Sequence, residues 1–278
     1  MDELYLAALS TLPNLGRLTI LRLANLMGSS EAVYKAKKKE LISTNLLTSQ
    51  QVAMLLRERP EDLPVKLDYL TRKDGMRIIS IFDQDYPLSL KQLHDPPLVL
   101  YVKGELPKEN YRVAIVGSRN CTSYGIRATE EFAKALVSQG IPIISGGAKG
   151  IDSVAHEACL AAGGKTVAVM GCGLDITYPY ENKELFERIQ ENGAIISEFP
   201  PTTPPKGCNF PMRNRIIVGL SQAVIVAEAA LASGASITAN IAADEGRDVY
   251  CVPGNIFDDT SAGCNPLIRH GANLITSA

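Results

Sequence analysis

Residues 141–164 read IPIISGGAKGIDSVAHEACLAAGG, in which an apolar run, a glycine-rich turn and a helix-forming segment follow one another. The run 141–147 predicts a strand, and 151–164 predicts a helix. Residues 111–117 and 123–140 show the same strand-then-helix pattern just upstream, and 165–171 predict the next strand. Near-continuous Val, Ile and Ala strands joined by helices are typical of a parallel sheet covered on both faces. The stretch therefore predicts a doubly wound α/β fold.

The alternation extends through the rest of the chain towards its C-terminal part. We expect further strands at 194–198, 223–229 and 248–254, with helices at 182–193, 210–220 and 234–246. Upstream, residues 76–82 and 97–104 also predict strands, and a proline-containing segment separates them. Residues 1–70 are expected to be helical, with helices at 4–12, 18–27 and 48–59. The expected organisation is thus a helical domain (1–70), bridging strands packed on the main domain (71–110), and the main α/β domain (111–278).

The segment LPNLG at residues 12–16 lies between the first two expected helices. A Pro-x-x-Gly turn in this position is typical of a helix–hairpin–helix element, whose backbone N–H groups can face a phosphate. An ordinary tight turn in a small helical bundle would have the same sequence. Both interpretations stay open at this point.

Composition limits the classes of partner. The chain has 278 residues, a hydrophobic fraction of 46%, a formal net charge of -2 and a pI near 6.0. A protein that coats nucleic acid non-specifically is usually more basic, so a polyanion would have to be held by a local patch. The six cysteines form no C-x-x-C pair and the three histidines are far apart, so we expect reduced thiols, no metal and no cofactor. No signal peptide or membrane-spanning run is visible, and we expect a cytoplasmic protein without membrane contact.

Small residues follow several of the expected strands. Because the carboxyl ends of parallel strands meet at one edge, the backbone N–H groups of these turns should face one crevice and favour an anion such as phosphate. The segments SGGAKGID, GSRNCT and GCGLDI match neither a Walker A loop nor a complete dinucleotide fingerprint. Each glycine alone could also serve a tight turn. The candidate phosphate-binding residues of these turns are Gly117, Ser118, Gly146, Gly147, Ser233 and Gly234.

Cations accompany these turns. Arg119 and Lys149 lie in the first two loops, and no acid occurs between Glu198 and Glu228, a segment that holds three further cations. Arginine can bind phosphate through two N–H groups, and an aromatic ring can stack on a base without regard to sequence. Phe210 could therefore read a single strand, or it could simply fill the core; one of the two arginines beside it could instead pair with Glu198 or Glu228. The candidates in this segment are Lys206, Phe210, Arg213, Asn214 and Arg215.

Catalytic candidates are sparse. Asp152 and His156 lie one helical turn apart on one face, which also fits a capping carboxylate and a packed imidazole. The chain has no G-x-S-x-G motif and no nucleophile with an evident base. We therefore expect a protein that binds rather than catalyses.

Several motifs together resemble the bacterial DNA-processing protein A (DprA/Smf) family. They include VGSR (116–119), SGGAKGIDSVAH (145–156), GCGLDITYP (171–179), SEFPP (197–201), FPMRNRIIVGLS (210–221), SGASITA (233–239) and VPGN (252–255). The resemblance implies an extended Rossmann fold over about residues 76–278, with N-terminal helices that look like the family's SAM-like domain. It implies a homodimer that binds single-stranded DNA, protects incoming DNA in natural transformation and loads RecA. The DNA pocket carried over from the family comprises Arg119, Lys206, Phe210, Arg213 and Arg215, beside the glycines of SGGAKG.

One point departs from this family pattern, and two other functions compete with it. Many family members carry a C-terminal winged-helix domain, which the given sequence, ending at ITSA, does not contain. The fold also resembles lysine-decarboxylase-like phosphoribohydrolases, which cleave nucleoside monophosphates. Their P-G-G-x-G-T-x-x-E motif is incomplete in SGASITANIAADEG (233–246). Nucleotide sensing in the crevice, without DNA contact, is a third possibility.

Overall fold

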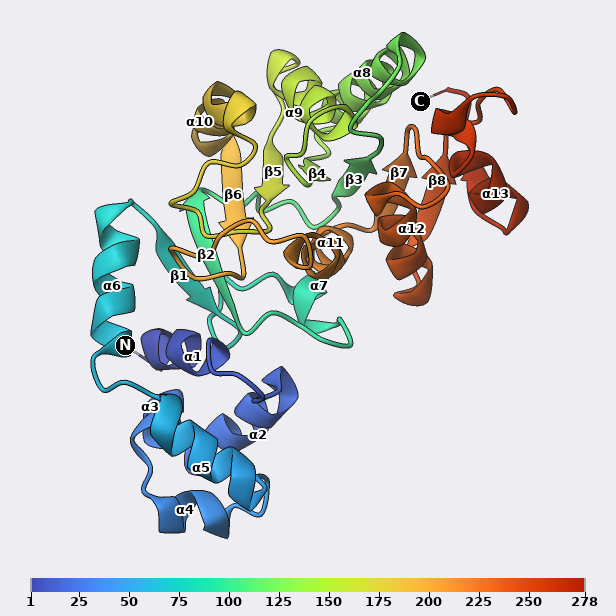
Figure 1. Cartoon of the computed structure of the whole chain (residues 1–278). Coiled ribbons are helices and arrows are strands. Elements are labelled where there is room, and N and C mark those ends of the chain that lie inside the picture. Colours follow the sequence, from blue (N-terminus) through green and yellow to red (C-terminus); the bar gives the residue numbers. More distant parts are fainter. Residues whose placement is uncertain (1, 278) are drawn as a thin grey trace.

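Within residues 2–277, which a computed structural model describes, nine strands form one sheet (Figure 1). The strand order is β1-β2-β6-β5-β4-β3-β7-β8-β9, parallel from β6 to β9, with β1 and β2 antiparallel at one edge. The expected doubly wound, mostly parallel sheet is confirmed. The strands are β1 Arg77–Ser80, β2 Val99–Gly104, β3 Val113–Val116, β4 Ile143–Ser145, β5 Thr166–Val169, β6 Gly193–Ser197, β7 Ala223–Val226, β8 Asp248–Cys251 and β9 Asn273–Leu274.

Helices cover both faces of the sheet because alternate side chains of each buried strand point to opposite sides. In β3, Val113 and Ile115 pack under α8 and α9, whereas Ala114 and Val116 pack against α11 and α12. The first face is covered by α8 Ser123–Ser138, α9 Ile151–Ala161 and α10 Lys183–Glu191. The other face is covered by α7 Leu88–Lys91, α11 Asn209–Leu220, α12 Gly234–Asp244 and α13 Cys264–Arg269, and two 3₁₀ turns lie at Tyr180–Asn182 and Asp259–Ser261.

The N-terminal part is a group of six short helices beside the β1–β2 edge (Figure 1). Local capping explains two of the helices that hydrophobic spacing did not predict: Ser29 caps α3 by accepting from Ala32 N, and Glu40 caps α4 by accepting from Lys37 N. The helices are α1 Asp2–Ser10, α2 Arg17–Met27, α3 Ser30–Lys35, α4 Lys38–Ser43, α5 Ser49–Glu58 and α6 Leu63–Lys73.

The N-terminal helices share a hydrophobic core with the sheet. One buried cluster runs from Leu6 and Leu9 of α1 through Tyr101 of β2 to Phe186 of α10 and Ile195 of β6. Helix α6 continues past residue 70, and the strands of segment 71–110 belong to the main sheet. Across the described chain, no helix is both long and apolar enough to cross a membrane.

Candidate functional site

A cleft of about 600 Å³ opens at the carboxyl ends of β3, β4 and β7. This is the edge at which open α/β sheets bind ligands. A smaller hollow of about 80 Å³ adjoins it, and the two share Arg119, Phe210 and Arg213. Of the residues predicted from sequence, the cleft is lined by Gly117, Ser118, Arg119, Phe210, Arg213, Asn214, Ser233 and Gly234, and the hollow by Gly146, Gly147 and Lys149.

The loop after β3 is held in place by the loop before α9. Ile151 N donates to Ser118 O at 3.1 Å, and Asn120 N donates to Ser118 Oγ at the same distance. Gly150 allows this contact: its φ is +81°, and a Cβ there would lie 2.3 Å from Ser118 O. Arg119, next to Ser118, is exposed and forms no ion pair with any part of the described chain. The loop thus presents a free guanidinium on a fixed backbone.

Phe210 lies at the centre of an aromatic and cationic cluster. Its half-buried ring is 5.6 Å from the ring of Tyr178, centroid to centroid. The guanidinium carbons of Arg119 and Arg213 lie 5.7 and 5.9 Å from its centroid, within cation–π distance. One ring edge packs on Gly171, where a Cβ would lie 2.9 Å from Phe210 Cδ1. One edge of the Phe210 ring is therefore packed against the protein, while the ring also lines the cleft. This position is compatible with both roles considered from sequence, filling the core and stacking on a base.

Arg213 lies under the cleft and braces two strand ends. It is 4% exposed, and its Nη1 donates to Gly146 O at 2.5 Å and to Val169 O. Burial lowers the pKa of Arg213 to about 10, although the charge of buried Asp152 opposes this shift. Its Nε has no hydrogen-bond partner among residues 2–277. The side chain thus contributes a fixed positive charge beneath the cleft and holds the ends of β4 and β5 together.

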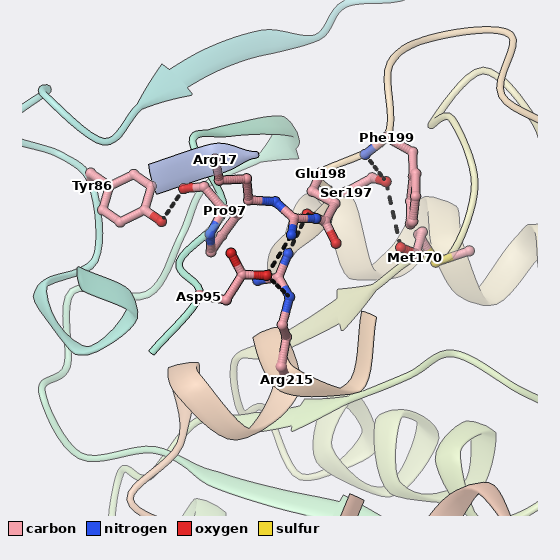
Figure 2. Close-up of polar contacts among 9 residues, drawn as sticks. All are labelled: Arg17, Tyr86, Asp95, Pro97, Met170, Ser197, Glu198, Phe199 and Arg215. Atoms are coloured by element: carbon pink, nitrogen blue, oxygen red, sulfur yellow. Dashed lines mark hydrogen bonds and ion pairs between the residues drawn. The ribbon is translucent and has the colours of Figure 1, made fainter. Parts of the chain in front are cut away.

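Arg215, by contrast, is not part of the cleft lining. Two residues along a helix turn a side chain well away from its neighbour, and Arg215 points to the opposite side of α11 from Arg213. There its Nη2 donates to Glu198 Oε2, in a network with Arg17 and Asp95 (Figure 2). Glu228, the other carboxylate considered from sequence, instead accepts from the backbone N and hydroxyl of Thr122, the N-cap of α8.

The remaining predicted cations lie at the rim. Lys206 is exposed between Pro205 and Gly207, both of which line the cleft, although Lys206 itself does not. Lys149 Nζ lies 2.5 Å from Glu181 Oε1 in an exposed ion pair. Exposed pairs of this kind contribute little to stability and exchange readily with other partners.

The polar lining opposite Phe210 is largely satisfied by the protein. Ser233 caps α12 by accepting from Ser236 N at 3.2 Å, and Asn214 Nδ2 donates to Gly234 O at 3.3 Å. Ile237 N likewise donates to Ser233 O, so that within the described chain the N–H groups of Gly234 and Ala235 are the ones left at the start of α12 for an anion. Tyr178, Asn120 and Ile237 also line the cleft without having been predicted. Tyr178 belongs to the motif GCGLDITYP, and an aromatic residue in a segment that follows an expected strand was the available signal.

Asp152 and His156 are buried rather than arranged for catalysis. His156 Nδ1 lies 2.7 Å from Thr166 Oγ1, which itself donates to Ile143 O, so the imidazole is the donor. Burial lowers the pKa of His156 to about 3 and raises the pKa of Asp152. Asp152 Oδ2 accepts from Ala148 N at 3.3 Å. Among residues 2–277, no group of three or more His, Cys, Asp or Glu side chains is placed to hold a metal ion.

Several known proteins are similar to this chain in sequence. The family model of DNA recombination-mediator protein A matches residues 77–278. DNA processing protein DprA of Streptococcus pneumoniae is 47% identical over 199 residues, covering 71% of this chain and 70% of that protein. Protein Smf of Synechocystis is 37% identical over 281 residues, covering 99% of this chain and 71% of that protein.

Solved structures show the same relationship. The crystal structure of DNA processing protein A from Streptococcus pneumoniae superposes with a TM-score of 0.85 at 36% identity, covering 100% of this chain and 95% of that one. A structure that describes the single-stranded DNA binding mode of DNA processing protein A from Helicobacter pylori has a TM-score of 0.65 at 32% identity. That match covers 73% of this chain and 91% of the Helicobacter chain.

Proposed function

The chain belongs to the DNA recombination-mediator protein A family, and from that premise we propose that it binds single-stranded DNA in the cleft around Phe210. The observation that carries the proposal is the cluster of Phe210 and Tyr178 with two guanidinium groups at the carboxyl edge of the sheet. The relative from Helicobacter pylori, whose structure describes single-stranded DNA binding, supports it. A base would stack on the aromatic face, and Arg119 and the first turn of α12 would contact phosphates.

The same lining supports binding without sequence preference. Base-specific recognition needs side-chain donors and acceptors that are free to meet base edges. Here the Asn214 amide donates to Gly234 O, Ser233 caps α12, and Arg213 donates to two backbone carbonyls. These three side chains are therefore largely engaged by the protein itself. An aromatic face stacks on any base, and exposed cations and backbone N–H groups contact phosphates whatever the sequence.

We further propose that the protein acts by binding rather than by catalysis, in the cytoplasm, to protect incoming DNA during transformation and to load RecA. The buried His156, whose pKa is lowered to about 3 and whose Nδ1 contacts Thr166, supports a non-catalytic cleft. A homodimer would place two clefts on one strand and so raise the apparent affinity of modest individual sites. The expected division at residues 70 and 110 remains a proposal about how the chain is organised along its sequence.

The direct test is a polarisation titration of labelled oligo-dT with the wild type, Arg119→Ala and Arg127→Ala. Arg119 is exposed, makes no ion pair in the described chain and contacts the Phe210 ring, so its removal should weaken binding about ten-fold while leaving the fold intact. The slope of log K against log salt should also become shallower by about 0.7, the contribution of one phosphate on a single strand. Arg127, exposed on α8 outside the cleft, carries the same charge and is the matched control. Equal affinities for the two variants would remove Arg119 from the site.

A further inference from the structure

Four charged side chains from four separate segments meet on the far side of α11 from the cleft (Figure 2). Glu198 Oε2 accepts from Arg17 Nη2 at 2.9 Å and also from Arg215 Nη2. Asp95 Oδ2 lies 2.5 Å from Arg17 Nη1 and 3.8 Å from Arg215 Nε. Each carboxylate therefore lies between the same two guanidinium groups. The segments joined are α2, the loop before β2, the end of β6 and α11.

The network is connected to the cleft through one rigid helix. Helix α11 carries Phe210 and Arg213 on its cleft side and Arg215 on the network side. Its other end is fixed by close packing, because a Cβ at Gly219 would lie 2.5 Å from Leu93 Cδ1. A helix moves as a unit over two turns, so a shift at Arg215 is passed to the Phe210 ring.

The positive and negative charges of this network balance only while Arg17 is present. The Glu198 side chain is 7% exposed and that of Arg215 is 13% exposed, so neither can reach water freely. Without Arg17, buried Glu198 would keep Arg215 as its guanidinium partner, whereas Asp95, whose side chain is 42% exposed, could be solvated by water. An incompletely compensated buried charge is strongly unfavourable, so the surroundings of Glu198 and Arg215 would have to rearrange.

We propose that Arg17 is a positioning residue: through Glu198, Asp95 and Arg215, the N-terminal helices hold α11 in the orientation that presents Phe210 to DNA. The inference rests on the proposed function for its consequence in binding, but the placement of Phe210 by Arg17 is a property of the protein alone. The two parts can therefore be tested separately.

The first arm is ¹⁹F NMR of full-length protein labelled with 4-fluorophenylalanine, which gives signals from six phenylalanines. The Phe210 signal is assigned as the one missing from Phe210→Leu. We expect Arg17→Ala to shift the signals of both Phe199, next to Glu198, and Phe210. Arg72→Ala is the matched control, because it removes an exposed arginine of α6 that pairs with Asp68 and should shift neither signal. A shift of Phe199 without one of Phe210 would overturn the proposal, since the change would then stop at the network.

The second arm is the oligo-dT titration. Arg17→Ala should weaken binding about 3- to 10-fold relative to the wild type, at a temperature where both proteins are folded. Arg17→Lys keeps the charge but cannot contact both carboxylates as arginine does, so its affinity should lie between those of the wild type and Arg17→Ala. In a Glu198→Gln background the same Arg17 change should have a smaller effect, because the pathway is already broken. Arg17→Ala binding as tightly as Arg72→Ala would overturn the proposal. If the wild type itself fails to bind oligo-dT, the proposed function fails, and the ¹⁹F arm still decides the placement of Phe210.

Discussion

His156 is a buried imidazole whose protonation should make stability depend on pH. Its folded pKa is about 3, well below the ordinary value of 6.5, so the unfolded chain binds the extra proton first. The stability that neutral His156 contributes is therefore complete above about pH 6.5 and is lost as pH falls from there towards 3. The loss approaches about 1.4 kcal/mol per pH unit once the unfolded histidine is protonated.

The measurement is urea unfolding of wild type, His156→Asn and His94→Asn at several pH values between 7 and 4. His156→Asn should be less stable at pH 7 but should lose stability less steeply on acidification than wild type. His94 is exposed, and its replacement should leave the wild-type slope unchanged. Parallel curves for wild type and His156→Asn would mean that the imidazole is not buried in its neutral form.

Residue-scale roles were only partly predictable from the sequence. The motif around 210–215 indicated two arginines and one aromatic ring. Helical spacing puts Arg213 and Arg215 on different faces of α11, but the sequence could not show which of them faces the cleft. Glu198, one of the two carboxylates expected from sequence, is the partner of Arg215. The other two members of the network, Arg17 and Asp95, are far away in sequence and follow no local pattern. The contacts that hold Arg213 in its buried position were likewise not predictable. Its guanidinium donates to carbonyls at the ends of two strands, which only the folded sheet brings together.

At the scale of elements, the contact between two loops should control the cleft. Gly150→Ala would place a Cβ against the carbonyls of Ser118 and Arg119 at 2.3 and 2.6 Å, and backbone cannot move aside as a flexible side chain can. We expect it to displace the β3–α8 loop and weaken oligo-dT binding by more than ten-fold, in addition to a loss of about 1–3 kcal/mol in stability.

Gly163→Ala is the matched control. Gly163 has a φ of +76°, close to that of Gly150, but a Cβ there would meet nothing within 4 Å. It should lose about 1 kcal/mol from backbone strain and keep its DNA affinity. Polarisation titration and urea unfolding of both variants separate strain from loop displacement. Equal binding by the two would show that the loop contact does not shape the site.

Elements were predicted best where the hydrophobic pattern was long. The buried strands were predicted from near-continuous apolar runs, which arise because helices cover both faces of the sheet. The helices α8 to α12 were predicted from the helical spacing of their apolar residues. The short helices α3, α4 and α7 carry too few residues to show a period, and their ends are set by caps and by packing. The pairing of β2 with β6 is antiparallel and long-range, so no local signal announces it.

For the whole molecule, the shared core predicts a single unfolding transition. The cluster from Leu9 to Ile195 joins the N-terminal helices to the sheet, and the ion pairs of Arg17 cross the same boundary. Residues that share one core lose their packing together. Urea unfolding followed by far-UV circular dichroism and by hydrogen exchange of α2 should give coincident midpoints. An earlier midpoint for α2 would show that residues 1–70 form a separate folding unit.

The strand order has a consequence for how the protein is made on the ribosome. Strands β1 and β2 emerge early, but Tyr101 of β2 pairs with Ser197 of β6, which is translated only after β3, β4 and β5. Until then the free edge of β2 exposes unpaired N–H and C=O groups beside apolar side chains, a combination that favours association with other chains. A nascent chain stalled between β5 and β6 would therefore carry an unfinished sheet edge, and translation through residue 197 is the step that closes it.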